Sequence, residues 1–117
     1  PTQDVYRAFD TLQPRALQEH AIRALANHHV LEPERLFNDL APAACLVRPD
    51  LARLLSHVTS VAGLPAHLAG AGSGIFVLTP PERAHALAAR LIQDPLLRGC
   101  ALIATRFADP RAIEPPP

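Results

Sequence analysis

The sequence predicts an α+β fold in which a small antiparallel sheet is layered with about five helices. Three observations predict it. Apolar residues recur at helical spacing over residues 2–62 and again over residues 81–94. Two β-prone runs, "PAHLA" and "GIFVLT", flank a glycine-rich stretch, and a third run, "GCALIATRF", follows the last helix. With 117 residues, 49% of them hydrophobic, the chain has the size of one domain with a single core.

Two helices are expected at the beginning of the chain, over residues 2–13 and 14–29. Thr2 is a suitable N-cap for the first, because its hydroxyl can accept a hydrogen bond from a free backbone N–H. Pro14 suits the start of the second. The apolar residues expected to face inward from these helices are Val5, Phe9, Leu12, Leu17, Ile22 and Leu25.

Two further helices are expected before the glycine-rich stretch. One begins near Glu32 and bends around Pro42, because proline removes a backbone donor and clashes with the preceding turn. The other begins at Pro49 and ends at Gly63, since glycine readily adopts the left-handed conformation that terminates a helix. Its inward face contains Leu51, Leu54, Leu55, Val58 and Val61.

The two β-prone runs around the glycines predict a β-hairpin. A fifth helix then opens at Pro80 and Pro81, and its inward residues are Ala84, Leu87, Ala88, Leu91 and Ile92. Residues 99–107 are expected to form a third strand, and residues 109–117 a proline-rich tail that does not pack. A sheet of three strands exposes two edges, so we expect a fourth strand upstream of Pro1.

The composition excludes several classes of function. Eleven arginines balance eleven acidic residues, so the chain predicts neither a nucleic-acid partner nor a membrane surface. There is no lysine, which excludes a P-loop lysine and a Schiff-base lysine. No apolar run is long enough for a membrane span. Cys45 and Cys100 are expected to be small buried thiols in a reducing compartment, which favours a cytoplasmic location.

The glycine cluster is the first candidate site. It is not a dinucleotide-binding motif, which runs from a strand into a helix, because the residues after Gly74 are "IFVL". Free backbone N–H groups at Gly70, Gly72 and Gly74 would suit an anion, but a plain hairpin turn explains the glycines equally well. His67 lies nearest in sequence and is expected to be structural. Asn38 and Asp39 are expected to anchor a hydrogen-bond network or a local cap.

Three segments, "TQDVYRAFD", "LFNDLAPAACLVRPDLARL" and "GLPAHLAGAGSGIFVL", resemble the C-terminal domain of the 4-diphosphocytidyl-2-C-methyl-D-erythritol kinases in order and spacing. These enzymes belong to the GHMP kinase superfamily. The resemblance runs from Thr2 to about Phe107. It implies a GHMP-kinase C-terminal domain over residues 1–108, followed by the tail. It also implies that an N-terminal ATP-binding kinase domain is missing from this chain.

The resemblance further implies an activity. Such kinases use ATP and Mg²⁺ to phosphorylate the 2-hydroxyl of the methylerythritol moiety of their substrate, in non-mevalonate isoprenoid biosynthesis. Tyr6 matches the aromatic position that stacks on the cytosine, and Thr2 matches a position near the methylerythritol end. The family's glycine loop, which faces the cleft for ATP and substrate, corresponds to Gly70, Ala71, Gly72, Ser73 and Gly74.

The chain also departs from the family pattern. Ala69 and Ala71 stand where relatives often carry serine. The catalytic Asp and Lys and the ATP loop belong to the family's N-terminal half, so the chain alone is expected to be inactive and to bind neither ATP nor Mg²⁺. It begins at Pro1 without a methionine and reads as part of a longer protein. Two alternatives stay open: another GHMP small-molecule kinase, and a stand-alone α+β binding or interaction module.

Overall fold

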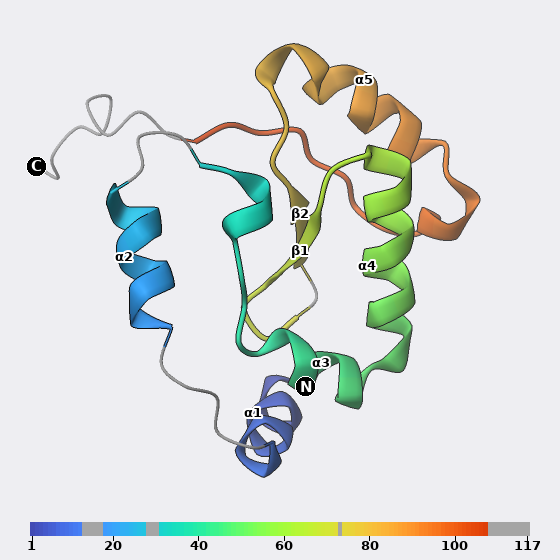
Figure 1. Ribbon diagram of the computed structural model, residues 1–117. Helices are drawn as coiled ribbons and strands as arrows, with labels where there is room; N and C mark the ends of the chain where they lie inside the picture. The colour runs from blue at the N-terminus through green and yellow to red at the C-terminus, as the bar shows by residue number, and fades with distance from the viewer. Residues whose placement is uncertain (13–17, 28–30, 73, 108–117) are drawn as a thin grey trace, which may run out of the picture. The chain divides into compact units, whose positions relative to one another are not determined.

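The computed structural model describes residues 1–12, 18–27, 31–72 and 74–107 (Figure 1). The described part has an α+β architecture with five α-helices and a two-stranded antiparallel sheet. It divides into two compact units, Pro1–Leu78 and Thr79–Pro117. The α+β prediction is therefore confirmed, and most of the predicted helices and the hairpin lie in the first unit.

The first unit contains four α-helices, a short 3₁₀ turn and the hairpin. In chain order they are α1 (Thr2–Thr11), α2 (Glu19–Asn27), η1 (Pro33–Arg35), α3 (Ala41–Val47), α4 (Pro49–Ala62), β1 (Ala66–Ala69) and β2 (Gly74–Val77). Helix α1 packs on α3, and α4 packs on both α3 and β1. Parts of the predicted second helix, residues 13–17 and 28–30, lie outside the described residues.

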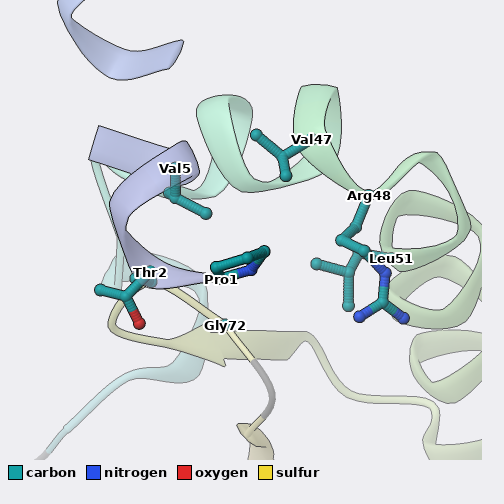
Figure 2. Close-up of a pocket in the computed structure, with 8 residues that line it drawn as sticks. Pro1, Thr2, Val5, Val47, Arg48, Leu51 and Gly72 are labelled. Atoms are coloured by element: carbon teal, nitrogen blue, oxygen red, sulfur yellow. The ribbon is translucent and has the colours of Figure 1, made fainter. Parts of the chain in front are cut away.

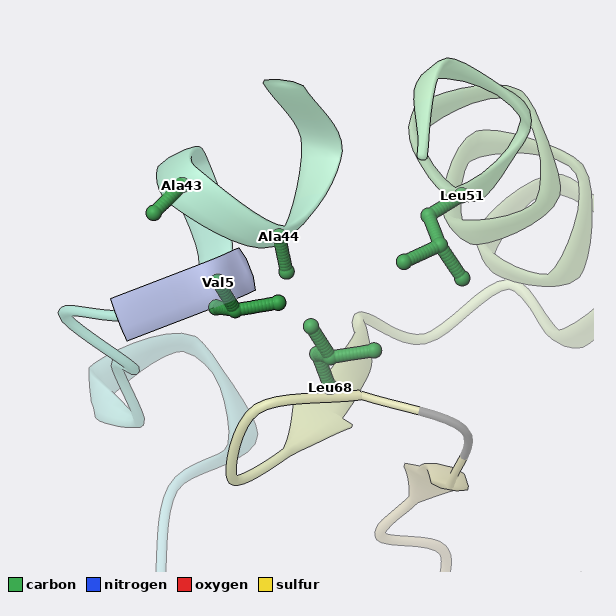
Figure 3. Close-up of a cluster of buried hydrophobic side chains, with 5 residues drawn as sticks. All are labelled: Val5, Ala43, Ala44, Leu51 and Leu68. Carbon is green, nitrogen blue, oxygen red and sulfur yellow. The ribbon is translucent and has the colours of Figure 1, made fainter. Parts of the chain in front are cut away.

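The core of this unit is a cluster of small and medium aliphatic side chains, shown in Figure 3: Val5, Ala43, Ala44, Leu51 and Leu68. The two alanines of α3 are fully buried. Because alanine adds little bulk, α1 can lie close against α3, and Val5 reaches the side chains of α4 and β1. Burying a valine or leucine side chain stabilises the fold by about 1.5–3 kcal/mol. The cluster therefore fixes the start of α1, the start of α4 and the end of β1 relative to one another.

Helix α4 follows the prediction at both ends. Pro49 occupies its first turn, where a missing N–H costs nothing. Gly63 ends it with a φ of +66° and donates its N–H to the Thr59 carbonyl at 2.9 Å. The Thr59 hydroxyl accepts a hydrogen bond from the Ala66 N–H at 3.0 Å, so α4 is tied directly to β1.

The hairpin is confirmed, with β1 and β2 in antiparallel register from Ala66 opposite Val77 to Ala69 opposite Gly74. The N–H of Ala66 and the C=O of Leu68 both bond to side chains outside the hairpin, those of Thr59 and Asn38. Since backbone groups of alternate residues in an antiparallel pair point away from the partner strand, these two mark the outer edge of β1. The side chains of Thr59 and Asn38 thus occupy two hydrogen-bonding positions on that edge.

Two helix starts differ from the prediction. Pro1 stands at the N-cap of α1, and Thr2 is the first helical residue, without a side-chain capping bond. The helix expected to start near Glu32 is a single 3₁₀ turn, and a separate helix, α3, begins at Ala41. Pro42 lies in the first turn of α3 and does not bend it, because proline fits where no N–H is needed.

The second unit contains α5 (Pro81–Ile92) and a 3₁₀ turn, η2 (Pro95–Leu97). Leu91 is buried, as predicted, but Ile92 is 71% exposed, so its inward placement was wrong. The predicted third strand is also missing: within the described residues, positions 101–107 carry no strand assignment, and Ile103 and Phe107 are exposed. A β-prone run forms a strand only where a ladder partner satisfies its backbone. The tail, residues 109–117, lies outside the described part.

Other predicted inward residues are exposed as well. Phe9 is 40% exposed and Ile22 is 54% exposed. Both cysteines are free, as expected, but only Cys45 is partly buried, whereas Cys100 is exposed. Helical spacing places Phe9 and Val5 on one face, yet it is Val5, Ala8 and Leu12 that pack into the core cluster, whereas Phe9 is not among its members.

Candidate functional site

A small hollow of about 150 Å³ opens between the start of α1, the junction of α3 and α4, and the glycine loop (Figure 2). Its lining comes from three segments that are far apart in the sequence: Pro1, Thr2, Val5, Val47, Arg48, Leu51, Ala71 and Gly72. Figure 2 shows Thr2 and Arg48 on either side of Pro1. The lining combines apolar side chains with the Thr2 hydroxyl and the Arg48 guanidinium.

The glycine loop makes a tight turn between β1 and β2. Gly70 has a φ of +55° and Gly72 a φ of +126°, both in the region where side chains cause strain. The Gly72 N–H donates to the Ala69 carbonyl at 3.2 Å. The turn therefore favours glycine at both positions on its own account, and most strongly at Gly72. The glycines are therefore not by themselves evidence of a ligand. The evidence for a ligand role is the position of the loop, because Ala71 and Gly72 line the hollow.

Asn38 anchors a hydrogen-bond network, one of the two roles expected for the Asn38–Asp39 pair; the N-cap of α3 is Leu40, without a side-chain capping bond. Its Nδ2 donates to the Leu68 carbonyl at 2.9 Å and to the Gly70 carbonyl at 2.7 Å. Its Oδ1 accepts from the Leu40 N–H at 2.9 Å, just before α3. Asp39 makes a separate contact, in which its Oδ1 accepts from Gln18 Nε2 at 3.1 Å.

The charged side chain in the lining of the hollow is that of Arg48, which forms a two-pronged ion pair with Asp50. Arg48 Nη2 lies 2.7 Å from Asp50 Oδ2, and Arg48 Nε lies 3.1 Å from Asp50 Oδ1. The hydrogen bonds from Arg48 lower the pKa of Asp50 below its usual value, and Asp50 in turn raises the pKa of Arg48. Both side chains are well exposed, so the pair is screened by water and Arg48 can also meet a second anion.

The structure brings only part of the predicted site together. Thr2, Ala71 and Gly72 line the hollow. Tyr6 does not; it lies one helical turn after Thr2 and is 51% exposed. Gly70 and Gly74 belong to the turn and to β2 without lining the hollow, and Ser73 lies outside the described residues.

Sequence reasoning missed Val47, Arg48 and Leu51 as lining residues. Arg48 and Leu51 flank the Pro49–Asp50 helix start, which the sequence does signal. Their place beside α1 and the glycine loop follows from tertiary packing, so no local pattern could have shown it. The link from Asn38 to Gly70 spans 32 positions and was likewise not readable.

The donor set of the hollow fits a small anionic or hydroxyl-bearing group. Ligand pockets for whole organic molecules usually enclose about 300–1,000 Å³, so this hollow is too small for a nucleotide. Its lining contains no carboxylate, and no group of three or more His, Cys, Asp and Glu in the described part of the chain could hold a metal ion.

His67, the histidine nearest the loop, packs on Phe76 with ring centroids 5.4 Å apart. Its Nε2 is buried and has no hydrogen-bond partner among the described residues. His67 of β1 lies opposite Phe76 of β2, and the two rings pack across the strands. This contact agrees with the structural role expected for His67.

None of the helices within residues 1–12, 18–27, 31–72 and 74–107 combines the length and apolar character that crossing a membrane requires. In comparisons with known proteins, no family model, no curated protein and no solved structure matches this chain.

Proposed function

We propose that the chain is the substrate-binding C-terminal part of an ATP-dependent small-molecule kinase of the GHMP type. Its substrate would be 4-diphosphocytidyl-2-C-methyl-D-erythritol, phosphorylated at the 2-hydroxyl in non-mevalonate isoprenoid biosynthesis. One observation carries the proposal: Thr2 and the glycine-loop residues Ala71 and Gly72 line the same hollow. The sequence resemblance assigns both segments to the substrate cleft, although they lie at opposite ends of the first unit's sequence.

The chemistry of the hollow supports a phosphate-bearing ligand. The exposed Arg48 guanidinium can pair with a phosphate oxygen, and charge-assisted hydrogen bonds are the stronger ones. The Thr2 hydroxyl can donate to the same group or to a sugar-like hydroxyl. The absence of a side chain at Gly72 lets a ligand approach the backbone. Arg48, Thr2 and Gly72 would hold one small polar end of the substrate, while the remainder extends outward.

Tyr6 is suitably placed for the cytosine end. Residues four apart on a helix share a face, so Tyr6 lies beside Thr2 on α1. Half of its side chain is exposed, which leaves a ring face open to a base. Stacking of a base on an aromatic side chain contributes about 1–3 kcal/mol.

Phosphoryl transfer needs more than this chain contains. Such catalysis depends on positioning and on charge stabilisation around the transferred group, and the lining offers Arg48 without a carboxylate or a metal site. Under this proposal, ATP and Mg²⁺ bind mainly to another domain that packs against the chain. Large exposed apolar side chains in the first unit support such packing: Tyr6, Phe9, Ile22, Leu31, Phe37, Leu46 and Phe76.

The test is an NMR titration of the 117-residue chain with cytidine 5′-diphosphate, with adenosine 5′-diphosphate as the comparison. We expect the amide signals of Thr2, Tyr6 and Gly72 to shift with the cytidine compound and much less with the adenosine compound. Tyr6→Ala should weaken binding by roughly 5- to 100-fold, and Tyr6→Phe, the matched control, should retain it.

Each other outcome bears on the proposal. An equal response to both nucleotides would favour another small-molecule kinase over a cytidine-specific one. No response at Thr2 and Gly72 would overturn the kinase proposal and favour the stand-alone interaction module.

A further inference from the structure

Both the amide nitrogen and the amide oxygen of Asn38 form hydrogen bonds, the nitrogen to the hairpin and the oxygen to the segment just before α3. A side-chain amide has two N–H donors, and here one reaches the Leu68 carbonyl and the other the Gly70 carbonyl. Its oxygen accepts from the Leu40 N–H. The amide has only this orientation, because a flipped group would set its oxygen against two carbonyl oxygens. Asn38 thus joins the end of β1 and the glycine loop to the start of α3.

The glycine loop needs such support. Gly70 and Gly72 both have positive φ, and glycine has more backbone conformations to choose from than any other residue. Within the described residues, the loop's own backbone contributes the bond from Gly72 to Ala69, at 3.2 Å. The two bonds from Asn38, at 2.9 and 2.7 Å, come from outside the hairpin. They are the contacts that select one loop conformation.

We infer that Asn38 is the positioning residue of the glycine loop: its amide holds the carbonyls of Leu68 and Gly70, and thereby fixes Ala71 and Gly72 where they line the hollow. The Asn38 side chain is not among the residues that line the hollow, so it acts through the loop. The inference about loop position stands on hydrogen bonds alone; its consequence for ligand binding rests on the proposed function.

The same bonds affect what an anion would meet. Carbonyl oxygens repel a phosphate, and the Leu68 and Gly70 oxygens are both engaged by Asn38. Asn38 also sets the start of α3, where its own carbonyl accepts the Ala41 N–H at 3.0 Å. Helix α3 leads to Val47, on the opposite wall of the hollow. One residue, through its side chain and its backbone carbonyl, therefore relates the loop on one side to the α3–α4 junction on the other.

Asn38→Asp is the variant that tests this inference, with Thr59→Val as its matched control. The aspartate keeps an oxygen for the Leu40 N–H but replaces both N–H donors by a negatively charged oxygen, so the loop is released while the turn before α3 keeps its bond. Thr59→Val removes the other side-chain bond to the outer edge of β1, at Ala66, without touching the loop. Hydrogen exchange of the Gly72 amide and binding of cytidine 5′-diphosphate are measured for both.

We expect Gly72 exchange to rise about tenfold or more in Asn38→Asp, relative to the α3 amides, and to change in parallel with the rest of the hairpin in Thr59→Val. Lowering the pH toward 4 should return the ratio of Gly72 exchange to α3 exchange partly to its wild-type value in Asn38→Asp, because a protonated carboxyl can again donate to a carbonyl. The ratio is the readout because acid slows the intrinsic exchange of every amide. A variant that merely weakened the fold would show no such reversal. Gly72 exchange that rises no more than exchange in α3, or no recovery in acid, would overturn the inference.

The two proposals fail separately. If wild-type chain ignores cytidine 5′-diphosphate but Asn38→Asp still releases the loop, the proposed function falls and the positioning role stands. If the nucleotide binds and Asn38→Asp leaves both affinity and loop exchange unchanged, the positioning role falls and the proposed function stands.

Discussion

Leu51 of α4 lies beneath Gly72 of the glycine loop: the Cδ1 atom of Leu51 is 3.9 Å from the position that a Cβ at residue 72 would take. That distance is an ordinary van der Waals contact, so an alanine side chain would fit. The backbone is the obstacle, because the φ of +126° at residue 72 is one that side chains rarely allow. Because a Cβ at residue 72 would not clash with Leu51, any loss of stability in a Gly72→Ala variant reports backbone strain and not steric crowding.

Gly72→Ala is expected to destabilise the chain by about 1–3 kcal/mol through strain alone. Gly70→Asn is its control, since asparagine tolerates a φ near +55° and nothing lies near that position, so its cost should stay below about 1 kcal/mol. Urea unfolding followed by circular dichroism measures both. Equal costs for the two variants would show that the strain argument is wrong.

Leu68→Ala should cost about 2–5 kcal/mol, because it opens a cavity where α1, α3, α4 and β1 meet. Leu68 is only 3% exposed, whereas Leu46 in the same unit is 61% exposed. Leu46→Ala should therefore change the unfolding free energy by less than about 0.5 kcal/mol. Denaturant titration of both variants is the measurement, and a small cost for Leu68→Ala would contradict the core described above.

The Arg48–Asp50 pair predicts a weak dependence of stability on acid pH. The pKa of Asp50 is lower in the folded chain than its usual 3.8, so the folded state favours the carboxylate. The stabilisation is complete above pH 3.8 and disappears as the pH falls through the lower, folded pKa. Arg48→Gln should return the pKa of Asp50 toward its usual value. An NMR titration of the Asp50 carboxyl carbon checks this, and an unchanged titration curve in Arg48→Gln would refute the pairing in solution.

Local signals explain which elements were predictable. Helix α4 is marked by Pro49 and Gly63 at its two ends, and α5 by Pro81, so both were found from the sequence. The hairpin follows from β-prone runs around glycines. The break after η1 was not predictable, because Asn38 there bonds to Leu68 and Gly70, 30 and 32 positions away. Residues 101–107 have a strand's composition, but pairing is a property of the fold.

The candidate site likewise contains residues that the sequence pointed to and residues that only the structure revealed. Thr2 and the glycine loop were found through their sequence resemblance, whereas Arg48 and Leu51 enter the hollow because α4 starts beside α1. Packing of the two buried alanines of α3 against α1 brings these helix starts together. How close the starts of α1 and α4 lie depends on how the side chains of three helices fill the space between them. That packing cannot be read from a local sequence pattern.

Two side chains from outside the hairpin form hydrogen bonds with the outer edge of β1. Thr59 accepts a hydrogen bond from the Ala66 N–H and Asn38 donates one to the Leu68 C=O, so a strand approaching from that side finds these two groups already engaged. Both bonds would have to break before a new ladder could form there. A strand that added to this sheet beside β1, from the same polypeptide or from another, would therefore first displace two side chains that belong to neither strand.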